Sequence, residues 1–428
     1  MSFLILESYL LAAFFAFAVE RMLRRMNLAY AWNQRDRIPA EIRDRLAEGH
    51  LDRVLDYLAA NTRFAQTENS LRLGIVLLYL FTGFLPWLGG LVGSLGTGAL
   101  VAGVLIFVLF GFIDSLVTLP FEYYETFCLE AHYGFNRTTR ATFWLDVLKG
   151  FLVKAVLGIP LAFGILWLIA ATGRWWWLPV TVFVVVFQLL VLLIFPRFIA
   201  PLFNRFTPLP EGELKQRLEE FARLCHFPVR DIFVMDGSRR SAHSNAYFTG
   251  LGRQRRLVLY DTLLQQLTAP ELTAVLAHEV GHYRKKHILW LLSCMALLVA
   301  GGAAAASVIL GWPEFFRAFR LPPDATALGL IVLSLTAGPF LFWISPLLHL
   351  IQRHFEYQAD AYAVAATGGA EALSSALLKL VEGNLDNLTP HPLYAAFHYS
   401  HPTPVERLAA LASRNAQRPE QPSAPPAV

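Results

Sequence analysis

Long uninterrupted runs of apolar residues dominate this chain. A helix needs about 20 residues to cross the hydrocarbon core of a bilayer, and seven runs reach or approach that length. They predict membrane-spanning helices near 3–19, 71–92, 97–119, 151–172, 176–196, 288–311 and 327–350. The first run is the weakest, because Glu7 interrupts it. No positive charge precedes it and Arg21, Arg24 and Arg25 follow it, a pattern that favours an uncleaved span over a signal peptide.

Lys and Arg are unevenly distributed between the segments that connect these runs. Nearly all of them fall in 20–72, 120–150, 197–287 and 351–428. The remaining connections hold only Arg174, Arg317 and Arg320. Because basic residues stay on the cytoplasmic side, this asymmetry predicts an outside N-terminus and a cytoplasmic C-terminus. All four basic segments then lie on one side, as an odd number of crossings requires.

The basic segments have patterns of their own. Apolar residues recur at helical spacing in 40–60 and 211–225, which predicts two amphipathic helices. Turn residues such as Asp236-Gly237 and Gly250-Leu251-Gly252 separate three runs of strand character. These predicted strands are Asp231–Met235, Asn245–Thr249 and Arg256–Tyr260.

A further helix is expected to begin just after Thr268. Thr268 with Glu271 three residues later is the pattern of a capping box, and Pro270 suits the first turn. We divide the chain into an N-terminal membrane region at 1–196, a peptidase region at 197–415 and a proline-rich tail at 416–428. The tail is expected to be disordered.

Composition supports the membrane interpretation. Hydrophobic residues make up 55% of the 428 residues and charged residues only 16%, whereas soluble domains are about a quarter charged. The net charge of +4 is small, and no basic patch interleaved with aromatics suggests a nucleic-acid partner. The three cysteines are far apart, which favours neither a disulfide framework nor a cysteine metal site. The fold class expected is an all-α membrane protein with a small β element.

The chemistry is concentrated in the sequence HEVGH at 278–282. His278 and His282 are four residues apart, so both imidazoles lie on one face of a helix and can bind one metal ion, typically zinc. Glu279 lies beside them, where it can take a proton from a water molecule that the metal activates and later deliver it to the leaving amine. Gly281 costs helix stability and therefore indicates a close approach to the backbone, by a packed helix or by the site itself.

A catalytic zinc site needs a third protein ligand and an open position, and Glu356 is the best candidate. Two predicted spans separate it from His282, so both half-sites return to the same side of the membrane. Asp360 lies four residues on and shares its helical face. It is expected either to orient a ligand histidine by a hydrogen bond or to donate a proton during the reaction.

These residues resemble a known family. HEVGH, followed after two spans by FEYQAD at 355–360, is similar to the type I CAAX prenyl proteases, which are multi-pass zinc endopeptidases of the gluzincin kind. The likeness extends over about 75–412. The stretches that carry it are LEAHYGFN at 129–136, APLFNRFTPL at 200–209, GSRRSAHSNAY at 237–247 and SHPTPVERL at 400–408.

The resemblance implies roles for individual residues. His278, His282 and Glu356 would hold one Zn²⁺ per chain, with Glu279 as general base and Asp360 as a second catalytic group. His401 would lie near the zinc and stabilise the oxyanion. Asn245, Ala246 and Tyr247 would bind the substrate backbone at an edge strand.

The resemblance also implies a fold and a partner. The family fold is a ring of seven helices around a chamber, with the peptidase site in its cytoplasmic part. The expected partners are the lipid bilayer and a peptide or lipidated-peptide substrate, and the pattern is compatible with a monomer. The Arg- and Ala-rich composition favours a bacterial inner membrane over an endoplasmic reticulum membrane. The activity implied is proteolysis of C-terminal CAAX or other hydrophobic, membrane-associated peptides. Since bacteria generally lack protein prenylation, a bacterial substrate is expected to be a membrane-associated or misfolded peptide rather than a prenylated one.

Two other classes of function compete with a peptidase. A membrane scaffold or quality-control partner could keep the metal for structure alone, but a structural zinc site needs no carboxylate at Glu279. A channel or transporter would require charged networks within the spans or paired broken helices, and the apolar runs show neither. The sequence therefore favours a membrane zinc endopeptidase.

Overall fold

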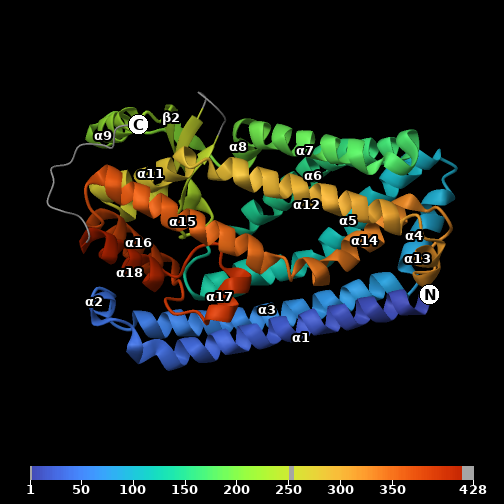
Figure 1. Cartoon of the computed structure of the whole chain (residues 1–428), viewed down its shortest axis with the longest axis horizontal. Helices are drawn as coiled ribbons and strands as arrows, with labels where there is room; N and C mark the ends of the chain where they lie inside the picture. The colour runs from blue at the N-terminus through green and yellow to red at the C-terminus, as the bar shows by residue number, and fades with distance from the viewer. Residues whose placement is uncertain (1, 250–254, 417–428) are drawn as a thin grey trace.

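The long helices lie side by side along the longest axis of the molecule (Figure 1). A computed structural model describes residues 2–249 and 255–416. The sheet and helices α9, α11, α16 and α18 gather at one end, and the N-terminus lies at the other end beside α4 and α13. The proline-rich tail, apart from its first residue, and the turn predicted at 250–252 lie outside the described residues.

Five of the described helices are long and apolar enough to cross a membrane. They are α1 (Ser2–Gln34), α5 (Ala99–Tyr124), α6 (Arg140–Thr172), α7 (Trp177–Ile194) and α12 (His287–Ile309). Two bent pairs also qualify: α3 (His50–Phe81) with α4 (Phe84–Gly93), at 55°, and α14 (Thr326–Leu341) with α15 (Ser345–Thr367), at 63°. Counting each pair as one crossing gives seven, the number that the apolar runs predict.

The second bend brings the seventh predicted span towards the site. The segment expected at 327–350 is not one helix, because α14 ends at Leu341 and α15 begins at Ser345. Pro346 lies in the first turn of α15, where its missing N–H costs nothing but where it cannot continue a preceding helix. The chain therefore changes direction between α14 and α15, and α15 runs on into the end of the molecule that holds the sheet (Figure 1).

The amphipathic helix predicted at 40–60 is wrong in its boundaries. The structure has a short α2 (Ala40–Arg43), a turn, and then α3, which continues from His50 to Phe81 without a break. Gly49 takes a left-handed conformation (φ 73°) at the start of α3, which is why the helix begins there. No proline or glycine pair interrupts α3, so the amphipathic part and the first part of the second predicted span form one helix, and the rest of that span is α4.

A four-stranded sheet has the order β1-β2-β4-β3. Its strands are β1 (Phe206–Pro208), β2 (Val229–Met235), β3 (Ala246–Thr249) and β4 (Arg255–Tyr260). β2 and β4 pair in parallel, whereas β1 and β3 pair antiparallel to their neighbours. The three predicted strands are present, with β3 starting one residue after Asn245, and β1 is the strand that the sequence pattern missed.

The sheet packs against α9 (Glu213–Leu224) and α11 (Ala269–Arg284) through a core of aliphatic side chains. α9 is the helix predicted at 211–225, and it buries Leu218 completely. Leu257 and Leu259 of β4 and Leu276 and Val280 of α11 belong to the same core. Burial of such side chains stabilises this end by about 1.5–3 kcal/mol each. The sheet is thereby fixed to the helix that carries both predicted histidine ligands.

The remaining helices complete the two ends. They are α8 (Ala200–Phe203), α10 (Asp261–Gln266), α13 (Pro313–Ala318), α16 (Glu371–Asn384), α17 (Pro392–His398) and α18 (Pro404–Ala416). A second core, at the end near the N-terminus, joins α4, α13 and α14 through Leu88, Phe316 and Val332. Large apolar side chains such as Val156 and Leu297, 70% and 72% exposed, lie on the outer faces of the long helices, as a lipid environment requires.

The capping box predicted at Thr268 is confirmed, and it also anchors α11 to α16. One Glu271 oxygen accepts from Thr268 N (2.7 Å) and from Lys379 Nζ (2.8 Å), and the other accepts from Ser375 Oγ (2.6 Å). Burial would raise the pKa of Glu271, but these donors lower it to about 2. The ionised carboxylate therefore stabilises the contact between α11 and α16.

Glu271→Gln should lower the stability of the protein by about 1–3 kcal/mol, because it replaces a charge-assisted network with neutral hydrogen bonds. The thermal midpoint in detergent measures this, with Glu219→Gln on the exposed face of α9 as control. The folded pKa of about 2 lies below the ordinary 4.5, so the stabilisation is present above pH 4.5 and is lost as the pH falls towards 2. If the thermal midpoints of wild type and Glu271→Gln differed by the same amount throughout this pH range, Glu271 would not be the ionised group that stabilises the contact.

Candidate metal centre

Three potential metal ligands converge where α11 packs along α15. His278 and His282 come from α11 and Glu356 from α15, and one ligand atom of each lies within 4.8 Å of the others. The two Nε2 atoms are 3.1 Å apart, and the Glu356 oxygens lie 3.4 Å from His278 Nε2 and 3.2 Å from His282 Nε2. The structure thus brings together all three residues that the sequence predicts as ligands.

These distances fit a single zinc ion. Zinc–nitrogen bonds of about 2.0–2.1 Å place any two ligand atoms of a tetrahedron about 3.3 Å apart. The three separations in the structure are 3.1, 3.2 and 3.4 Å. The last two separations involve different oxygens of Glu356, Oε1 towards His282 and Oε2 towards His278. The two nitrogens and the carboxylate therefore surround one position at the spacing of zinc ligands, which leaves a further coordination position for a water molecule or a substrate.

Hydrogen bonding on the far side of His278 determines which of its atoms faces the metal position. Its Nδ1 lies 2.8 Å from Asp360 Oδ1, so Nδ1 carries the proton and Nε2 presents a lone pair. That lone pair faces the Glu356 carboxylate, whose buried Oε2 has no hydrogen-bond partner. An unpaired buried carboxylate oxygen beside an imidazole lone pair is unfavourable unless a cation lies between them. The donor set therefore fits a metal ion.

Asp360 occupies the position of an orienting residue. It is fully buried and receives two hydrogen bonds from Arg407, at 2.9 Å from Nε and 2.6 Å from Nη2, besides the contact with His278. Both of its oxygens are therefore used. Of the two roles that the sequence left open, this arrangement favours orientation of His278 over proton donation.

His282 has a corresponding chain of contacts through His287. His282 Nδ1 lies 3.0 Å from His287 Nδ1, and His287 Nε2 lies 3.0 Å from Gln358 Oε1. Gln358 can only accept through that oxygen, so His287 Nε2 carries a proton and His287 Nδ1 accepts from His282 Nδ1. The ring of His287 stacks on Phe355 at 4.0 Å and is buried. This chain leaves His282 Nε2 free to bind metal.

Arg407 and His287 are site residues that sequence reasoning did not assign. Arg407 also lies 3.6 Å from Glu356, so one guanidinium pairs with two buried carboxylates. Arg407 belongs to the stretch at 400–408 that resembles the family. Nothing in the sequence indicated that it pairs with Asp360, which lies 47 residues away. His287 is not one of the three converging ligands; its contact is with His282.

Gly281 permits the close packing of the two helices. A Cβ atom at this position would come within 2.8 Å of Ala359 Cα and 3.0 Å of Ala359 O, both backbone atoms of α15. Of the two explanations that the sequence allowed for this glycine, the structure has the packed helix. Because Ala359 lies between Glu356 and Asp360, the same approach determines the distance from the histidines to both carboxylates.

Glu279 and His401 lie beside the three ligands. Burial raises the pKa of Glu279 above the usual carboxyl value, and the neighbouring histidines oppose that rise. His401 Nε2 lies 3.5 Å from Glu356 Oε1, and its Nδ1 lies 2.9 Å from Ser400 Oγ. The His401 side chain is 62% exposed, so it is accessible to a bound ligand.

A cavity of about 460 Å³ lies between residues that contact Glu356 and the residue that precedes β3. Asn245, His401 and Arg407 are among the residues that line it. β3, with Ala246 and Tyr247, is the last strand of the sheet, and its outer edge has no partner strand among residues 2–249 and 255–416. The residues predicted to bind a substrate backbone therefore lie at an available edge, next to a cavity that reaches the metal centre.

Four further histidines near this end of the molecule have other surroundings. His398 pairs with Glu20 at 3.0 Å, His391 accepts from Leu393 N, and His354 contacts Gln358 at 2.8 Å. The Nδ1 of His349 is buried without a hydrogen-bond partner. None of the four belongs to the cluster of potential ligands found in the described part of the chain.

Almost the whole chain matches models of known protein families. Residues 28–205 match the family described as "CAAX prenyl protease N-terminal, five membrane helices", and residues 208–415 match peptidase family M48. The chain is 37% identical to "CAAX prenyl protease 1 homolog" of Arabidopsis thaliana, over 78% of this chain and 80% of that protein. It is 34% identical to "CAAX prenyl protease 1" of Saccharomyces cerevisiae, over 88% of each.

A solved structure is similar as well. The crystal structure of S. mikatae Ste24p has a TM-score of 0.86 to this chain at 32% identity, covering 94% of this chain and 98% of the other. The fold class predicted from sequence, a helical membrane protein with a small β element, is confirmed by this likeness and by the helices described above.

Glu356→Ala should abolish stoichiometric metal binding, because it removes one of three ligands. Asp360→Asn should weaken zinc binding about 10–100-fold, since it removes the acceptor that orients His278. Metal content of the purified protein, and competition with a chelator, measure the two effects. Glu314→Ala, on α13 at the opposite end, is the control; full zinc content in Glu356→Ala would place the third ligand elsewhere.

Gly281→Ala should weaken zinc binding even though it changes no ligand, because the added methyl group forces α11 away from the α15 backbone. The matched control is Gly302→Ala in α12, where an added Cβ meets nothing within 4 Å. Zinc affinity and thermal midpoint should both fall for Gly281→Ala and stay unchanged or rise for Gly302→Ala. Equal changes in zinc affinity and thermal midpoint for the two variants would contradict the claim that Gly281 is needed for the packing of α11 on α15.

Proposed function

The chain belongs to the CAAX prenyl protease family of membrane metallopeptidases, peptidase family M48, and from this membership we propose that it is an endopeptidase using one zinc ion held by His278, His282 and Glu356. The observation that carries the proposal is the convergence of two imidazole nitrogens and one carboxylate at tetrahedral spacing. Zinc supplies Lewis acidity there, which lowers the pKa of a water molecule and polarises a peptide carbonyl.

Glu279 acts as the general base. It follows His278 in α11, and the charges of His278, His282 and Glu356 act on its carboxylate, which is therefore near all three potential ligands. A carboxylate with a raised pKa is a stronger base than an ordinary one, and a pKa closer to the working pH suits a group that must both take and give a proton. Glu279 therefore removes the proton of the attacking water and delivers it to the amine of the departing peptide.

The neighbouring residues hold the reacting groups in place. Asp360 and Arg407 fix the orientation of His278, and His287 fixes that of His282. His401, exposed to the cavity beside Glu356, donates a hydrogen bond to the oxygen on which negative charge develops during attack.

The substrate binds as an added strand. An extended peptide pairs with the free edge of β3 near Asn245, Ala246 and Tyr247, and its backbone then runs along the cavity towards His401. Because α15, which carries Glu356, belongs to a bent membrane pair, the site lies close to the membrane. We therefore assign to it C-terminal CAAX sequences or other hydrophobic, membrane-associated peptides; relatives are named CAAX prenyl proteases.

The same reasoning gives an orientation in the membrane. The metal centre and the sheet lie at the end opposite the N-terminus, and this end carries most of the basic residues (Figure 1). We place it in the cytoplasm and the N-terminus outside, in a bacterial inner membrane. In this arrangement residues 1–196 form the membrane region and 197–415 the peptidase region.

A non-catalytic scaffold with a structural metal is not favoured. A structural zinc site normally has four protein ligands, whereas only three converge here within the described residues. Glu279 would also have no function in such a scaffold.

Glu279→Gln should retain zinc and lose peptidase activity by a factor of about 10²–10⁴, because the amide cannot accept the proton of the attacking water. The assay compares cleavage of a farnesylated CAAX peptide and of an unprenylated hydrophobic peptide by the purified zinc-loaded protein. Glu314→Gln serves as control. Wild-type inactivity on both peptides with zinc bound, or full activity of Glu279→Gln, would contradict the proposed function.

A further inference from the structure

The cavity beside the metal centre has two walls of different character. Leu377, Leu380 and Val381 of α16 form an apolar wall, and Asn384, Asp386 and Asn387 line the cavity beside it. Its volume of about 460 Å³ falls in the range of pockets that bind small ligands. None of these residues takes part in the hydrolysis described above, although Asn245 and His401 line the same cavity.

Asp386 is the one charged group on these walls, and its carboxylate is available. The side chain is exposed, and it forms no hydrogen bond or ion pair with any described residue, its recorded neighbour being the charge of His243. The other titratable groups that line the cavity have partners: Arg407 bonds to Asp360, and His398 pairs with Glu20. His401 lies 3.5 Å from Glu356. A free carboxylate next to an apolar wall remains for a ligand.

The backbone directs Asp386 into the cavity. α16 ends with Leu385 in the left-handed conformation (φ 54°), a position that usually holds glycine. Leu385 N bonds to Glu382 O and Asp386 N bonds to Val381 O, which together form a Schellman turn. Leu385 is itself buried against Val54 and Phe135. The surrounding structure therefore maintains a costly conformation that places the next side chain in the cavity.

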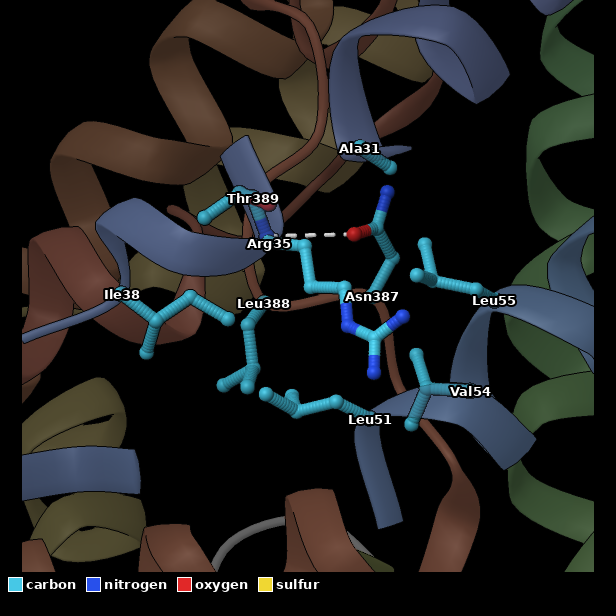
Figure 2. Close-up of a pocket in the computed structure, with 9 residues that line it drawn as sticks. All are labelled: Ala31, Arg35, Ile38, Leu51, Val54, Leu55, Asn387, Leu388 and Thr389. Carbon is cyan, nitrogen blue, oxygen red and sulfur yellow. Dashed lines mark hydrogen bonds between the residues drawn. The ribbon is translucent and has the colours of Figure 1, made fainter. Parts of the chain in front are cut away.

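The residues that follow are anchored to the N-terminal helices. Figure 2 shows Asn387, Leu388 and Thr389 surrounded by side chains of α1, α3 and the segment between them, among them Ile38 and Leu51. Asn387 Oδ1 accepts from Thr389 N at 3.1 Å, and Leu388 is 2% exposed. Asp386 therefore lies between two packed parts of the chain, Leu385 before it and residues 387–389 after it.

The local charge is negative. His243 lies between Glu130, 3.3 Å from its Nε2, and Asp386, so a protonated His243 compensates only one of two carboxylates. Asp386 is accessible from the cavity, but the protein around the cavity limits the hydration of its carboxylate and raises its pKa to about 6, and His243 opposes that rise. A carboxyl group in this state gains stability when a cation is brought next to it.

We propose that this cavity is a specificity pocket for a lysine or arginine side chain of the peptide substrate, with Asp386 as the residue that selects it. The aliphatic stem lies along Leu377, Leu380 and Val381, and the terminal cation pairs with the Asp386 carboxylate. The inference rests on the proposed peptidase function and adds the class of residue that the enzyme prefers near the cleaved bond.

A positional set of quenched fluorescent peptides tests this. In each peptide one residue around the cleaved bond is Lys, Met or Glu, and kcat/KM is measured with the zinc-loaded full-length protein in detergent. At one position the wild type should prefer Lys over Met by about tenfold, because an ion pair forms in a partly enclosed site. Asp386→Asn should reduce this ratio to near one, and Asp386→Lys should prefer Glu.

Asp44→Asn is the matched control, since Asp44 is 73% exposed and lies outside the cavity; it should keep the tenfold ratio. Zinc content and thermal midpoint establish that each variant is folded, and the Lys-to-Met ratio within each variant is the quantity compared. Glu279-dependent cleavage with the same Lys-to-Met ratio in wild type and Asp386→Asn overturns the specificity pocket alone. Absence of Glu279-dependent cleavage of every peptide overturns the proposed function and this inference with it.

Discussion

The close approach of α11 to α15 is the contact on which the rest of this structure depends. Gly281 allows the two backbones to come nearer than any side chain would permit, and the backbone that it faces, at Ala359, lies between Glu356 and Asp360. The distance between the helices therefore sets the distance from His278 to both carboxylates. The bend between α14 and α15 directs α15 towards α11. On its other face, α11 packs against the sheet through the shared aliphatic core.

Buried charge imposes the second constraint. Glu356 and Asp360 are almost or fully excluded from solvent, and a single guanidinium, that of Arg407, lies against both. Two carboxylates with one cation leave a net negative charge, which a bound divalent metal ion reverses. Arg407 comes from α18, so the last described helix is tied to the centre electrostatically, as α16 is tied to α11 through Glu271.

Sequence patterns predicted the parts of the molecule that depend on local spacing. The apolar runs gave the crossings, and the four-residue spacing of the histidines gave one helical face. The pairing of Thr268 with Glu271 gave a helix start. Helix boundaries were less predictable where tertiary packing decides them: α3 continues through a stretch that looked like two elements, and β1 is only three residues long. The resemblance to a family supplied His401, Asn245, Ala246 and Tyr247, whose roles stay predictions.

Contacts between distant residues could not be predicted from spacing. Arg407 lies 47 residues from Asp360 in sequence, and the direction of its side chain depends on the packing of α18. His287 was recognisable as a histidine near the membrane, but its contact with His282 depends on the left-handed turn at Lys286 (φ 58°) between α11 and α12. Asp386 could not be identified as a site residue from the sequence, because its position in the cavity depends on the turn at Leu385.

X-ray absorption at the zinc edge of the purified protein tests the central claim most directly. The account predicts one zinc ion per chain with two imidazole nitrogens at about 2.0–2.1 Å, oxygen ligands at about 2.0–2.2 Å and no sulfur. A spectrum with fewer than two imidazoles, or protein that binds no zinc when it is folded, would contradict the assignment of this centre.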